Sequence, residues 1–518
     1  MMKMKMNMNM MLASCKYCVI ILMMHVIIWG DMIVLGEGGR IGINWGRKNT
    51  QRMIPSMVVD LLLQNKIKEV RFYPARNVLE AFSGTRDLIT TSITIPNDYF
   101  FQFNSQEEVL EWVDIWITTF KQRVNFRYVV LGNQPYSKSF FKNKTYQHTV
   151  EKLDLLQNAL EARGYGNEIK ATTPHYNDLL NMYRNKSVKP SEAEFLPEFR
   201  DRMTEYLRVL RKNNAPAMLN VIPMQYILEN NLDVSFAFMD GKSSYKVIDN
   251  NGLVYDNAFE LLYDSFLWAM IKTGHGDVKL VVSQIGWPTD ALPGASTANA
   301  ERFHKYFLPY ITSGIGTPLR PGMNIDAFLQ NLSDENKLGL KWGAYQRHWG
   351  VYEFNGVPKY KIDFTGQGHK TLPSVARGLT SMPRRWCVFN GNTTRDNKTL
   401  SSEIDKCCAF SDCTSLEEGG SCSHLEYEKK VSYAFNRYFQ TMVHNQSEVC
   451  AINGFGEIVY TDPSDGNCTF PIEILAAEYK QIQDEFLGAK SGTPGNPDDY
   501  YESAASVRKN IIMHNIVL

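Results

Sequence analysis

The sequence of 518 residues lacks an excess of charge of either sign, because 55 basic residues balance 55 acidic ones. This balance argues against a protein that binds nucleic acid or another polyanion through a strong overall basic field. No internal repeat of solenoid length is present. Apolar residues are not scarce: 44% of the chain is hydrophobic and 12% is aromatic, which excludes a disordered chain and is enough for a large core.

Cysteine is missing from residues 19–386, although the chain has nine cysteines in all. Two of them precede this stretch, at positions 15 and 18, and the others fall within residues 387–468. A long segment without cysteine followed by a short segment dense in it indicates two folding units. We expect disulfides to hold the second unit together.

Long apolar runs are also missing, except near the N-terminus. Residues 18–30 are apolar apart from His25 and follow a segment that contains three lysines. The run is too short for a membrane span of about 20 residues and is typical of the central part of a signal peptide. We therefore predict a signal peptide over residues 1–37, with an uncleaved anchor as the alternative.

Seven Asn-x-Ser/Thr sequons are compatible with secretion and glycosylation. They begin at Asn143, Asn185, Asn331, Asn392, Asn397, Asn445 and Asn467. Together with the leader and the clustered cysteines, they predict a secreted, extracellular protein whose mature chain has no integral membrane span.

Short runs with strand character alternate with helical stretches over residues 40–364. Eight such runs lie at residues 41–45, 70–73, 88–96, 128–133, 169–174, 217–223, 278–288 and 325–332. Amphipathic segments at helical spacing, such as residues 55–66 and 107–123, lie between them. Eight strand–helix units predict a (β/α)8 TIM barrel, in which reactive residues lie at the C-terminal ends of the strands.

The remaining segments differ in composition from the barrel. We expect the barrel to span residues 38–364 and a linker to span residues 365–385. A small, disulfide-rich α+β unit is expected over residues 386–475. Residues 476–518 are predicted to be a disordered tail, because the stretch from about Ala489 is rich in turn-forming residues.

Several motifs stand at the predicted strand ends. They read IGINWG (41–46), IPND (95–98), VVLGNQP (129–135), VSQIGWPTD (282–290), RPGMNIDAF (320–328) and QRHWGVYEFNGVPKY (346–360). This pattern resembles glycoside hydrolase family 17, the plant endo-β-1,3-glucanases, over residues 41–364. The second unit is similar to carbohydrate-binding module family 43, through WCVFN (386–390), CAFSDCTSL (408–416), GGSC (419–422), SYAFNRYFQ (432–440) and DPSDGNCTF (462–470).

The resemblance implies a retaining glycosidase, in which two carboxyl groups about 5–5.5 Å apart flank the scissile bond. It places the acid/base in an Asn-Glu-Pro motif after the fourth strand and the nucleophile in a Glu-x-Gly-Trp-Pro motif after the seventh. This sequence has Gln134 and Gln284 at those positions. An amide has no titratable proton near neutral pH, and its neutral oxygen does not readily form a glycosyl ester. We therefore predict an intact cleft with little or no hydrolysis.

The alternative is that another carboxylate replaces the two carboxyl groups that are missing at positions 134 and 284. Asp290 follows the seventh strand, and Asp334 and Glu335 follow the eighth. None of them stands at the tip of the fourth or seventh strand, and a displacement of about 1 Å already costs about a hundredfold in rate. Rescue by these groups is therefore disfavoured.

The resemblance also implies residues that bind the sugar. Asn133 is expected to hydrogen-bond a hydroxyl group, and Trp287 to stack on a sugar face. The other expected binding residues are Tyr136, Trp45, Glu335 and Lys337. We expect Arg347 and His348 to be structural.

The cysteine spacing of the second unit matches that of its family and implies three disulfides. The six cysteines concerned are Cys387, Cys408, Cys413, Cys422, Cys450 and Cys468. Their connectivity is open, and so is the fate of Cys407, the odd one. Zinc binding is the alternative but is disfavoured in a secreted chain, so we expect neither a metal nor another cofactor. If residues 432–440 are helical, Val431, Phe435 and Tyr438 share one face, which is expected to be core rather than a ligand platform.

Three functions follow from these observations. The first is a β-1,3-glucan (callose) binding protein of the plant cell wall with a glucanase fold and impaired catalysis, with association to the plasma membrane left open. The second is an active endo-β-1,3-glucanase or transglycosylase. The third is a structural wall protein without a sugar ligand. The module is implied to bind linear β-1,3-glucan, and a second tethered site raises apparent affinity through effective concentration.

Overall fold

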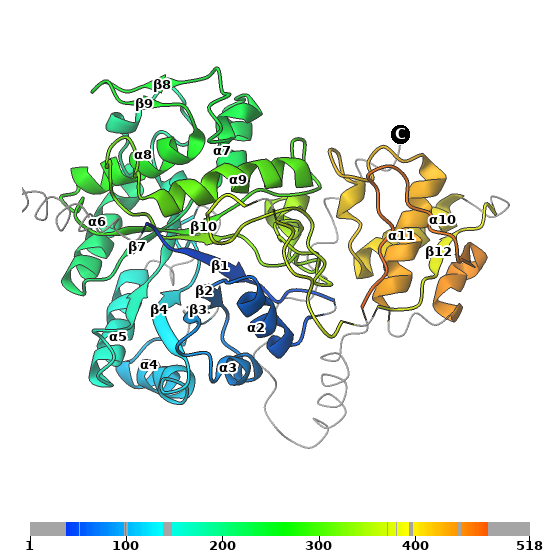
Figure 1. Cartoon of the computed structure of the whole chain (residues 1–518), viewed down its shortest axis with the longest axis horizontal. Helices are drawn as coiled ribbons and strands as arrows, with labels where there is room; N and C mark the ends of the chain where they lie inside the picture. The colour runs from blue at the N-terminus through cyan, green and yellow to red at the C-terminus, as the bar shows by residue number, and fades with distance from the viewer. Residues whose placement is uncertain are drawn as a thin grey trace, which may run out of the picture.

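A computed structural model describes residues 38–474, except for residues 51, 98, 100–101, 138–147, 370, 380, 393–396 and 443–446. The predicted signal peptide and the predicted disordered tail lie outside the described residues, as does the sequon at Asn143. Figure 1 shows a large unit and a smaller one that lies beside it, and the arrow of β1 (Ile41–Trp45) points toward the side of the smaller unit.

The larger unit is built on one sheet of nine parallel strands in the order β5-β4-β3-β2-β1-β11-β10-β7-β6. Strands β5 (Lys170–Thr172) and β6 (Pro174–Tyr176) are two pieces of one barrel strand, because only Thr173 separates them and they pair with β4 and β7 respectively. The sheet therefore curls into the predicted (β/α)8 barrel. The other strands are β2 (Glu69–Phe72), β3 (Thr90–Ile95), β4 (Asn125–Leu131), β7 (Ala217–Asn220), β10 (Leu280–Ile285) and β11 (Ala327–Leu329).

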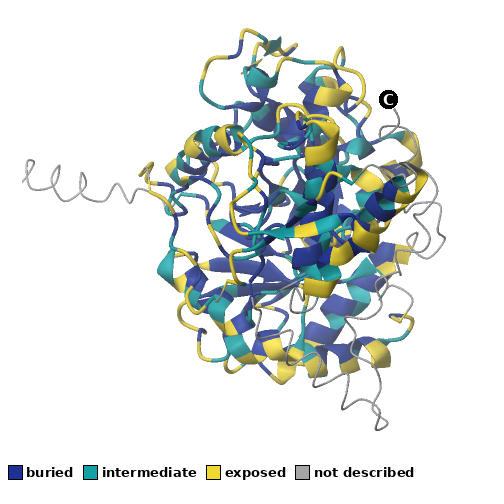
Figure 2. Ribbon diagram, turned by 90° about the vertical axis from the view of Figure 1, so that its right-hand side faces the viewer, coloured by how far each residue is buried: buried dark blue, intermediate teal, exposed yellow. Residues whose placement is uncertain are grey.

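Helices cover the outside of the barrel. They are α2 (Pro55–Gln64), α3 (Arg76–Phe82), α4 (Gln106–Val113), α5 (Thr149–Ala162), α6 (Pro197–Lys212), α7 (Pro223–Glu229), α8 (Ala258–Lys272) and α9 (Thr297–Ser313). Figure 2 shows buried strands at the centre and helices whose outer faces are exposed. A short hairpin, β8 (Val247–Ile248) and β9 (Val254–Tyr255), precedes α8.

Local sequence signals explain where the helices begin. Pro55 opens α2, where the missing N–H costs nothing, and the periodic apolar residues of this helix face the core. Ser105 and Glu108 form a capping box at the start of α4, in which each side chain accepts a hydrogen bond from the other residue's backbone N–H. The predicted long helix over residues 107–123 is α4 followed by a wider turn, Asp114–Thr118.

Charged side chains meet at the N-terminal end of the barrel. Arg127 on β4 bonds Glu69 at 2.6 Å and Asp326 at 2.8 Å, and Lys279 bonds Asp326 at 2.7 Å. Glu69 begins β2, and Asp326 directly precedes β11. Ion pairs at the N-terminal end of such a barrel contribute to stability. Functional groups are therefore expected at the C-terminal ends of the strands.

The smaller unit combines an antiparallel strand pair, β12 (Trp386–Phe389) and β13 (Gly456–Val459), with helices α10 (Asn397–Phe410) and α11 (Tyr427–Thr441). Three disulfides hold it: Cys387–Cys450, Cys408–Cys413 and Cys422–Cys468. Cys407 is free and buried. Val431 and Phe435 on α11 are buried and Tyr438 packs against them, so this stripe belongs to the core.

Candidate functional site

Gln134 lies in a tight turn directly after β4. Its φ angle is +52°, in the left-handed region that a residue with a side chain adopts at a cost of roughly 1–2 kcal/mol. The Gln134 N–H donates to the Pro174 carbonyl at 3.0 Å, which ties this turn to β6. The side chain is half-buried. Strained backbone that its surroundings hold in place is typical of functional sites.

Asn97, from the IPND motif, fixes this turn from the end of β3. Its Oδ1 accepts from the Asn133 N–H at 2.7 Å, and its Nδ2 donates to the Asn133 carbonyl at 3.1 Å. The side chain of Asn133 is held as well, because its Oδ1 accepts from Asn220 Nδ2 at 3.0 Å. Sequence reasoning gave Asn97 no role, since a side chain that holds a neighbouring strand end leaves no periodic signal.

Gln284 lies near the end of β10, where the strand is irregular. The register between β10 and β7 shifts between Val282 and Gln284, and Gln284 stands opposite Asn220. A bulge at a strand end redirects the side chain that follows it. Gln284 is half-buried, while its neighbours Ser283 and Ile285 are buried.

A buried cation lies beside the strand that carries Gln284. Arg71 on β2 is 5% exposed and donates to Asn44 Oδ1 at 2.8 Å and to the Ser283 carbonyl at 2.9 Å. Burial lowers its pKa to about 10, so it stays charged at neutral pH. Asn44 in turn donates to Gln330 Oε1 at 3.2 Å. The groups around this guanidinium are thus neutral amides and carbonyls, and a carboxylate introduced at position 284 would be favoured in its ionised form.

Asp290 is engaged elsewhere. Its Oδ1 accepts from the Ser421 N–H at 2.6 Å, and its Oδ2 accepts from the hydroxyls of Ser415 at 2.8 Å and Ser421 at 2.7 Å. Both serines belong to the smaller unit. The carboxylate therefore points away from the strand tips and holds the two units together.

The two acidic residues after β11 are engaged as well. Glu335 accepts from the Lys48 N–H at 3.0 Å and from Asn331 Nδ2 at 2.8 Å, and burial raises its pKa. It lies so close to the chain after β1 that a Cβ on Gly46 would be 2.1 Å from its carboxyl group. Asp334 accepts from Lys359 Nζ at 2.6 Å and from the Gly350 N–H at 2.8 Å. These contacts brace the loops that follow β1 and β11, while Lys337 is exposed.

The three aromatic residues expected to stack on sugar lie in the core, and this expectation needs correction. Trp287 is completely buried, packs between Phe238 and Phe303 at centroid distances of 4.8 and 5.9 Å, and donates its indole N–H to the Gly294 carbonyl. Tyr136 is also completely buried and Trp45 nearly so. A ring enclosed on both faces has no surface to offer a sugar, so these residues support the site from behind.

Exposed aromatic rings do occur at the same end of the barrel. Tyr73 directly follows β2 and is 39% exposed, and Trp342 lies in the loop after β11 and is 42% exposed. The sequence alone does not single out Tyr73 or Trp342, because only the folded chain shows which aromatic residues stay exposed. These two residues replace the buried trio as candidates for sugar contact.

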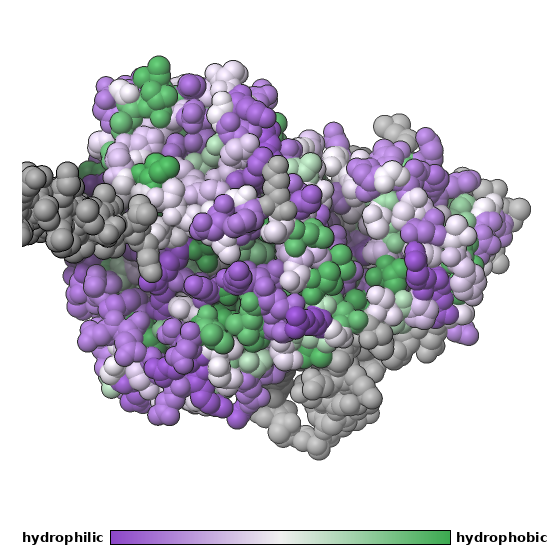
Figure 3. Space-filling view, in the orientation of Figure 1, coloured by the Kyte–Doolittle hydropathy of each residue, from purple (hydrophilic) through white to green (hydrophobic). Residues whose placement is uncertain are grey.

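The smaller unit has a shallow, mainly apolar hollow of its own between α11, β12 and the segment after β13. It is lined by Val388, Phe389, Lys429, Ser432, Val459, Thr461, Asp462, Pro463 and Phe470. Tyr460 lies in the same segment and is 77% exposed. Figure 3 shows separate apolar patches on otherwise hydrophilic surfaces of both units.

The sequons differ in accessibility. Asn185 and Asn467 are exposed, and Asn392 is half-buried. Asn331 is 3% exposed and its side chain bonds Glu335 and the Gly46 N–H, so the expectation of a glycan there is wrong. The side chains of Asn397 and Asn445 lie outside the described residues.

Between residues 38 and 474, apart from the gaps given above, no group of three or more His, Cys, Asp or Glu residues is arranged to hold a metal ion. None of the helices in this part of the chain is long and apolar enough to cross a bilayer.

Comparison with known proteins gives two matches to family profiles. Glycosyl hydrolases family 17 matches residues 41–364, and the X8 domain matches residues 385–457. Over 460 residues the chain is 35% identical to Glucan endo-1,3-beta-glucosidase 8 of Arabidopsis thaliana, covering 87% of this chain and 92% of that protein. It is 33% identical to Glucan endo-1,3-beta-glucosidase 5 of the same plant, with coverage of 87% and 91%.

Solved structures resemble the barrel. CJP38, a beta-1,3-glucanase and allergen of Cryptomeria japonica pollen, superposes with a TM-score of 0.58 at 27% identity, covering 63% of this chain and 99% of that one. A plant beta-glucan endohydrolase superposes with a TM-score of 0.56 at 29% identity, covering 62% and 99%.

Proposed function

We propose a function from one premise: the chain belongs to glycosyl hydrolases family 17 and carries an X8 domain after its barrel. On this premise the protein binds β-1,3-glucan at the C-terminal end of the barrel strands and hydrolyses it little or not at all. The relatives are named as glucan endo-1,3-beta-glucosidases, which supports this class of ligand.

One observation carries the proposed loss of hydrolysis. Half-buried amides, Gln134 and Gln284, stand at the two strand ends where a retaining glycosidase of this family needs carboxyl groups. The acidic residues nearest in sequence do not replace them, because Asp290, Asp334 and Glu335 each accept hydrogen bonds that hold loops or the second unit in place. The chain thus keeps the shape of the site without a group that protonates the leaving oxygen or attacks the anomeric carbon.

The C-terminal end of the barrel strands carries polar groups that suit a neutral sugar. Asn133 presents an amide whose position is fixed by Asn97 and Asn220. Tyr73 and Trp342 offer exposed rings, on which the C–H faces of glucose pack. On the smaller unit, which contains the X8 domain, Tyr460 and the hollow beside it provide a second surface of the same kind. Secretion to the cell wall is part of this proposal, in keeping with the three disulfides of the X8 domain.

Retention on insoluble β-1,3-glucan tests the binding. We expect the pure chain to be pulled down by β-1,3-glucan and not by cellulose. Trp342→Ala should weaken laminarin binding about tenfold, as expected for the loss of one well-packed aromatic contact. Ile248→Ala, which removes an exposed apolar side chain from the β8–β9 hairpin, is the matched control and should bind normally.

Absence of retention by β-1,3-glucan would contradict the proposal and favour a structural wall protein. The other candidate, an active endo-β-1,3-glucanase, is favoured by the names of the relatives. Release of reducing ends separates it from the proposed function.

A further inference from the structure

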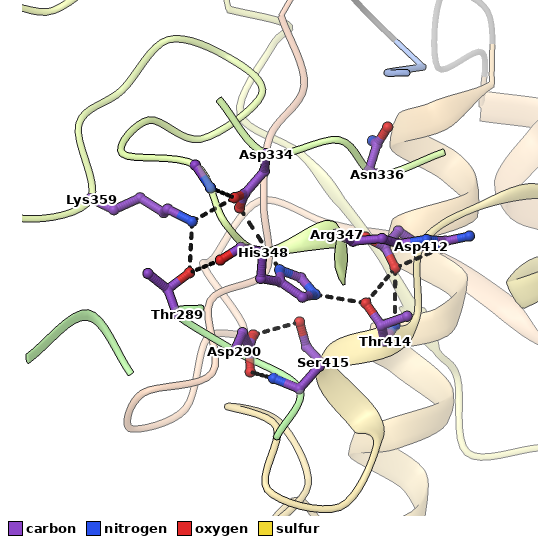
Figure 4. A network of polar contacts seen from close by, with 12 residues as sticks. Thr289, Asp290, Asp334, Asn336, Arg347, His348, Lys359, Asp412, Thr414 and Ser415 are labelled. Carbon is purple, nitrogen blue, oxygen red and sulfur yellow. Dashed lines mark hydrogen bonds and ion pairs between the residues drawn. The ribbon is translucent and has the colours of Figure 1, made fainter. Parts of the chain in front are cut away.

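Two loops of the barrel meet the X8 domain in a network of polar contacts (Figure 4). One loop follows β10 and contains Thr289 and Asp290, and the other follows β11 and contains Arg347 and His348. Both face a single segment of the X8 domain, residues 412–421. The contacts join residues that are 65 to 131 positions apart in the sequence.

A buried ion pair forms the first part of this interface. Arg347 Nη1 lies 2.9 Å from Asp412 Oδ1, and the two side chains are 15% and 6% exposed. The same Asp412 oxygen accepts from the Thr414 N–H at 3.1 Å and from its hydroxyl at 2.6 Å. Burial raises the pKa of Asp412, but Arg347, His348 and Arg437 lower it more, so the pKa lies well below its usual range. The carboxylate is therefore ionised and depends on its partners.

Asp290 forms the second part. It accepts from Ser415 and Ser421 and, within its own loop, from the Ala291 N–H at 2.7 Å. Burial raises the pKa of Asp290, but His348 and Ser421 lower it more, so the group is ionised. Separation of the two units would leave this carboxylate without the hydroxyl and N–H donors of the X8 domain. Because an ionised group without its hydrogen-bond partners costs free energy, this loss destabilises the separated state relative to the docked one.

His348 links the two loops to each other and to the X8 domain. Its Nε2 bonds Thr414 Oγ1 at 2.7 Å, and its carbonyl accepts from the Thr289 N–H at 2.8 Å and hydroxyl at 3.0 Å. Lys359 Nζ donates to Thr289 Oγ1 at 2.7 Å and so ties this pair to Asp334. The loop that leaves the Gln284 strand is thus held from both sides.

Close packing completes the contact. Gly419 lies against the backbone of the β10 loop, where a Cβ would be 2.3 Å from the Pro293 nitrogen. The guanidinium of Arg437 on α11 lies 5.7 Å from the centre of the Phe354 ring. Such close approach of backbone and side chains indicates a surface shaped for this partner rather than an incidental touch.

We infer that the barrel rim formed by residues 290–293 and 347–348 is a docking surface whose partner is the chain's own X8 domain. The two units form one fixed body: Ser415 and Ser421 hold the loop after Gln284, and Asp412 holds the loop that contains Arg347. The X8 domain therefore sets the geometry of one edge of the cleft. Because of this interface, the binding surface of the X8 domain has a fixed position relative to the strand ends of the barrel. A flexible linker would instead let that position vary.

Thermal unfolding and hydrogen exchange of the full chain test this inference without any sugar, so the outcome is independent of the proposed function. Asp290→Lys removes the acceptor from the barrel side, and Ser415→Ala with Ser421→Ala removes the two hydroxyl donors from the other side and keeps the Ser421 backbone N–H. Asp277→Lys is the matched control, because it makes the same change at an exposed ion pair with Arg211.

We expect the unmodified chain and Asp277→Lys to unfold in one calorimetric transition. In both interface variants the X8 domain should melt in a separate, earlier transition, and amide exchange in residues 286–291 and 412–421 should become at least about tenfold faster. Two transitions in the unmodified chain, or unchanged exchange in both interface variants, would overturn the inference. If Asp290→Lys does not fold, the serine double variant decides.

Discussion

Replacement of Trp287 tests whether this residue packs in the core or contacts the sugar. The structure assigns it to the core, between Phe238 and Phe303 and with its indole N–H bonded to Gly294. We therefore expect Trp287→Phe to lower the stability of the barrel and to leave glucan affinity nearly unchanged. Trp342→Ala removes an exposed ring and should leave the stability nearly unchanged while it weakens glucan binding.

The size of the effect follows from burial. Truncation of a large buried aromatic side chain to Ala costs about 3–5 kcal/mol, part of it from the cavity left behind. Trp287→Phe keeps one ring, so about half of that cost is expected, together with about 1 kcal/mol for the lost hydrogen bond. At about 2–4 °C for each kcal/mol in a domain of this size, the melting temperature should fall by roughly 5–15 °C.

Calorimetry gives the melting temperature, and titration with laminarin well below it gives the affinity. The reasoning is refuted if Trp287→Phe melts like the unmodified chain but binds laminarin about tenfold more weakly. The same holds if Trp342→Ala lowers the melting temperature as much as Trp287→Phe does.

Three further predictions concern pH, a thiol and a glycan. Burial lowers the pKa of His348, but Asp334, Asp412 and Asp290 raise it more, so this pKa lies above its usual value. The stabilising charge of His348 is thus present below about pH 6.5 and is lost as pH rises through the folded-state pKa. The melting temperature should therefore fall as pH rises above about 6.5, and this slope should flatten in His348→Gln. An equal slope in both proteins would contradict the assignment. Burial raises the pKa of Cys407 to about 12, so iodoacetamide at pH 8 should leave it unmodified in the folded protein and alkylate it in urea, as seen by mass spectrometry; rapid native labelling would refute its burial. Peptide mapping of chain secreted from a eukaryotic host should find no glycan at Asn331, while the exposed Asn185 and Asn467 remain accessible.

The architecture followed from the sequence because each barrel strand is a short apolar run and each outer helix has a helical period. The (β/α)8 fold and a disulfide-rich second unit were both confirmed. The sequence also placed Gln134 after the fourth strand and Gln284 near the end of the seventh, and the structure has them after β4 and near the end of β10.

The direction of the aromatic rings did not follow from the sequence. The motif around Trp287 reads the same whether the ring faces a sugar or the core, and only the neighbouring Phe238 and Phe303 decide. The docking interface was equally hidden. Asp290 and Ser415 are 125 positions apart, and scattered polar residues carry no periodicity that would reveal their contact.

Release of reducing ends from laminarin tests the central claim most directly. The unmodified chain should give no release above buffer, and Gln134→Glu combined with Gln284→Glu should create activity, with Arg71 favouring the ionised form of the new group at position 284. Each single reversion should stay at least about a hundredfold below the pair, because one carboxyl group supplies only the nucleophile or only the proton. Cleavage by the pure unmodified chain within about tenfold of the double variant would contradict the account.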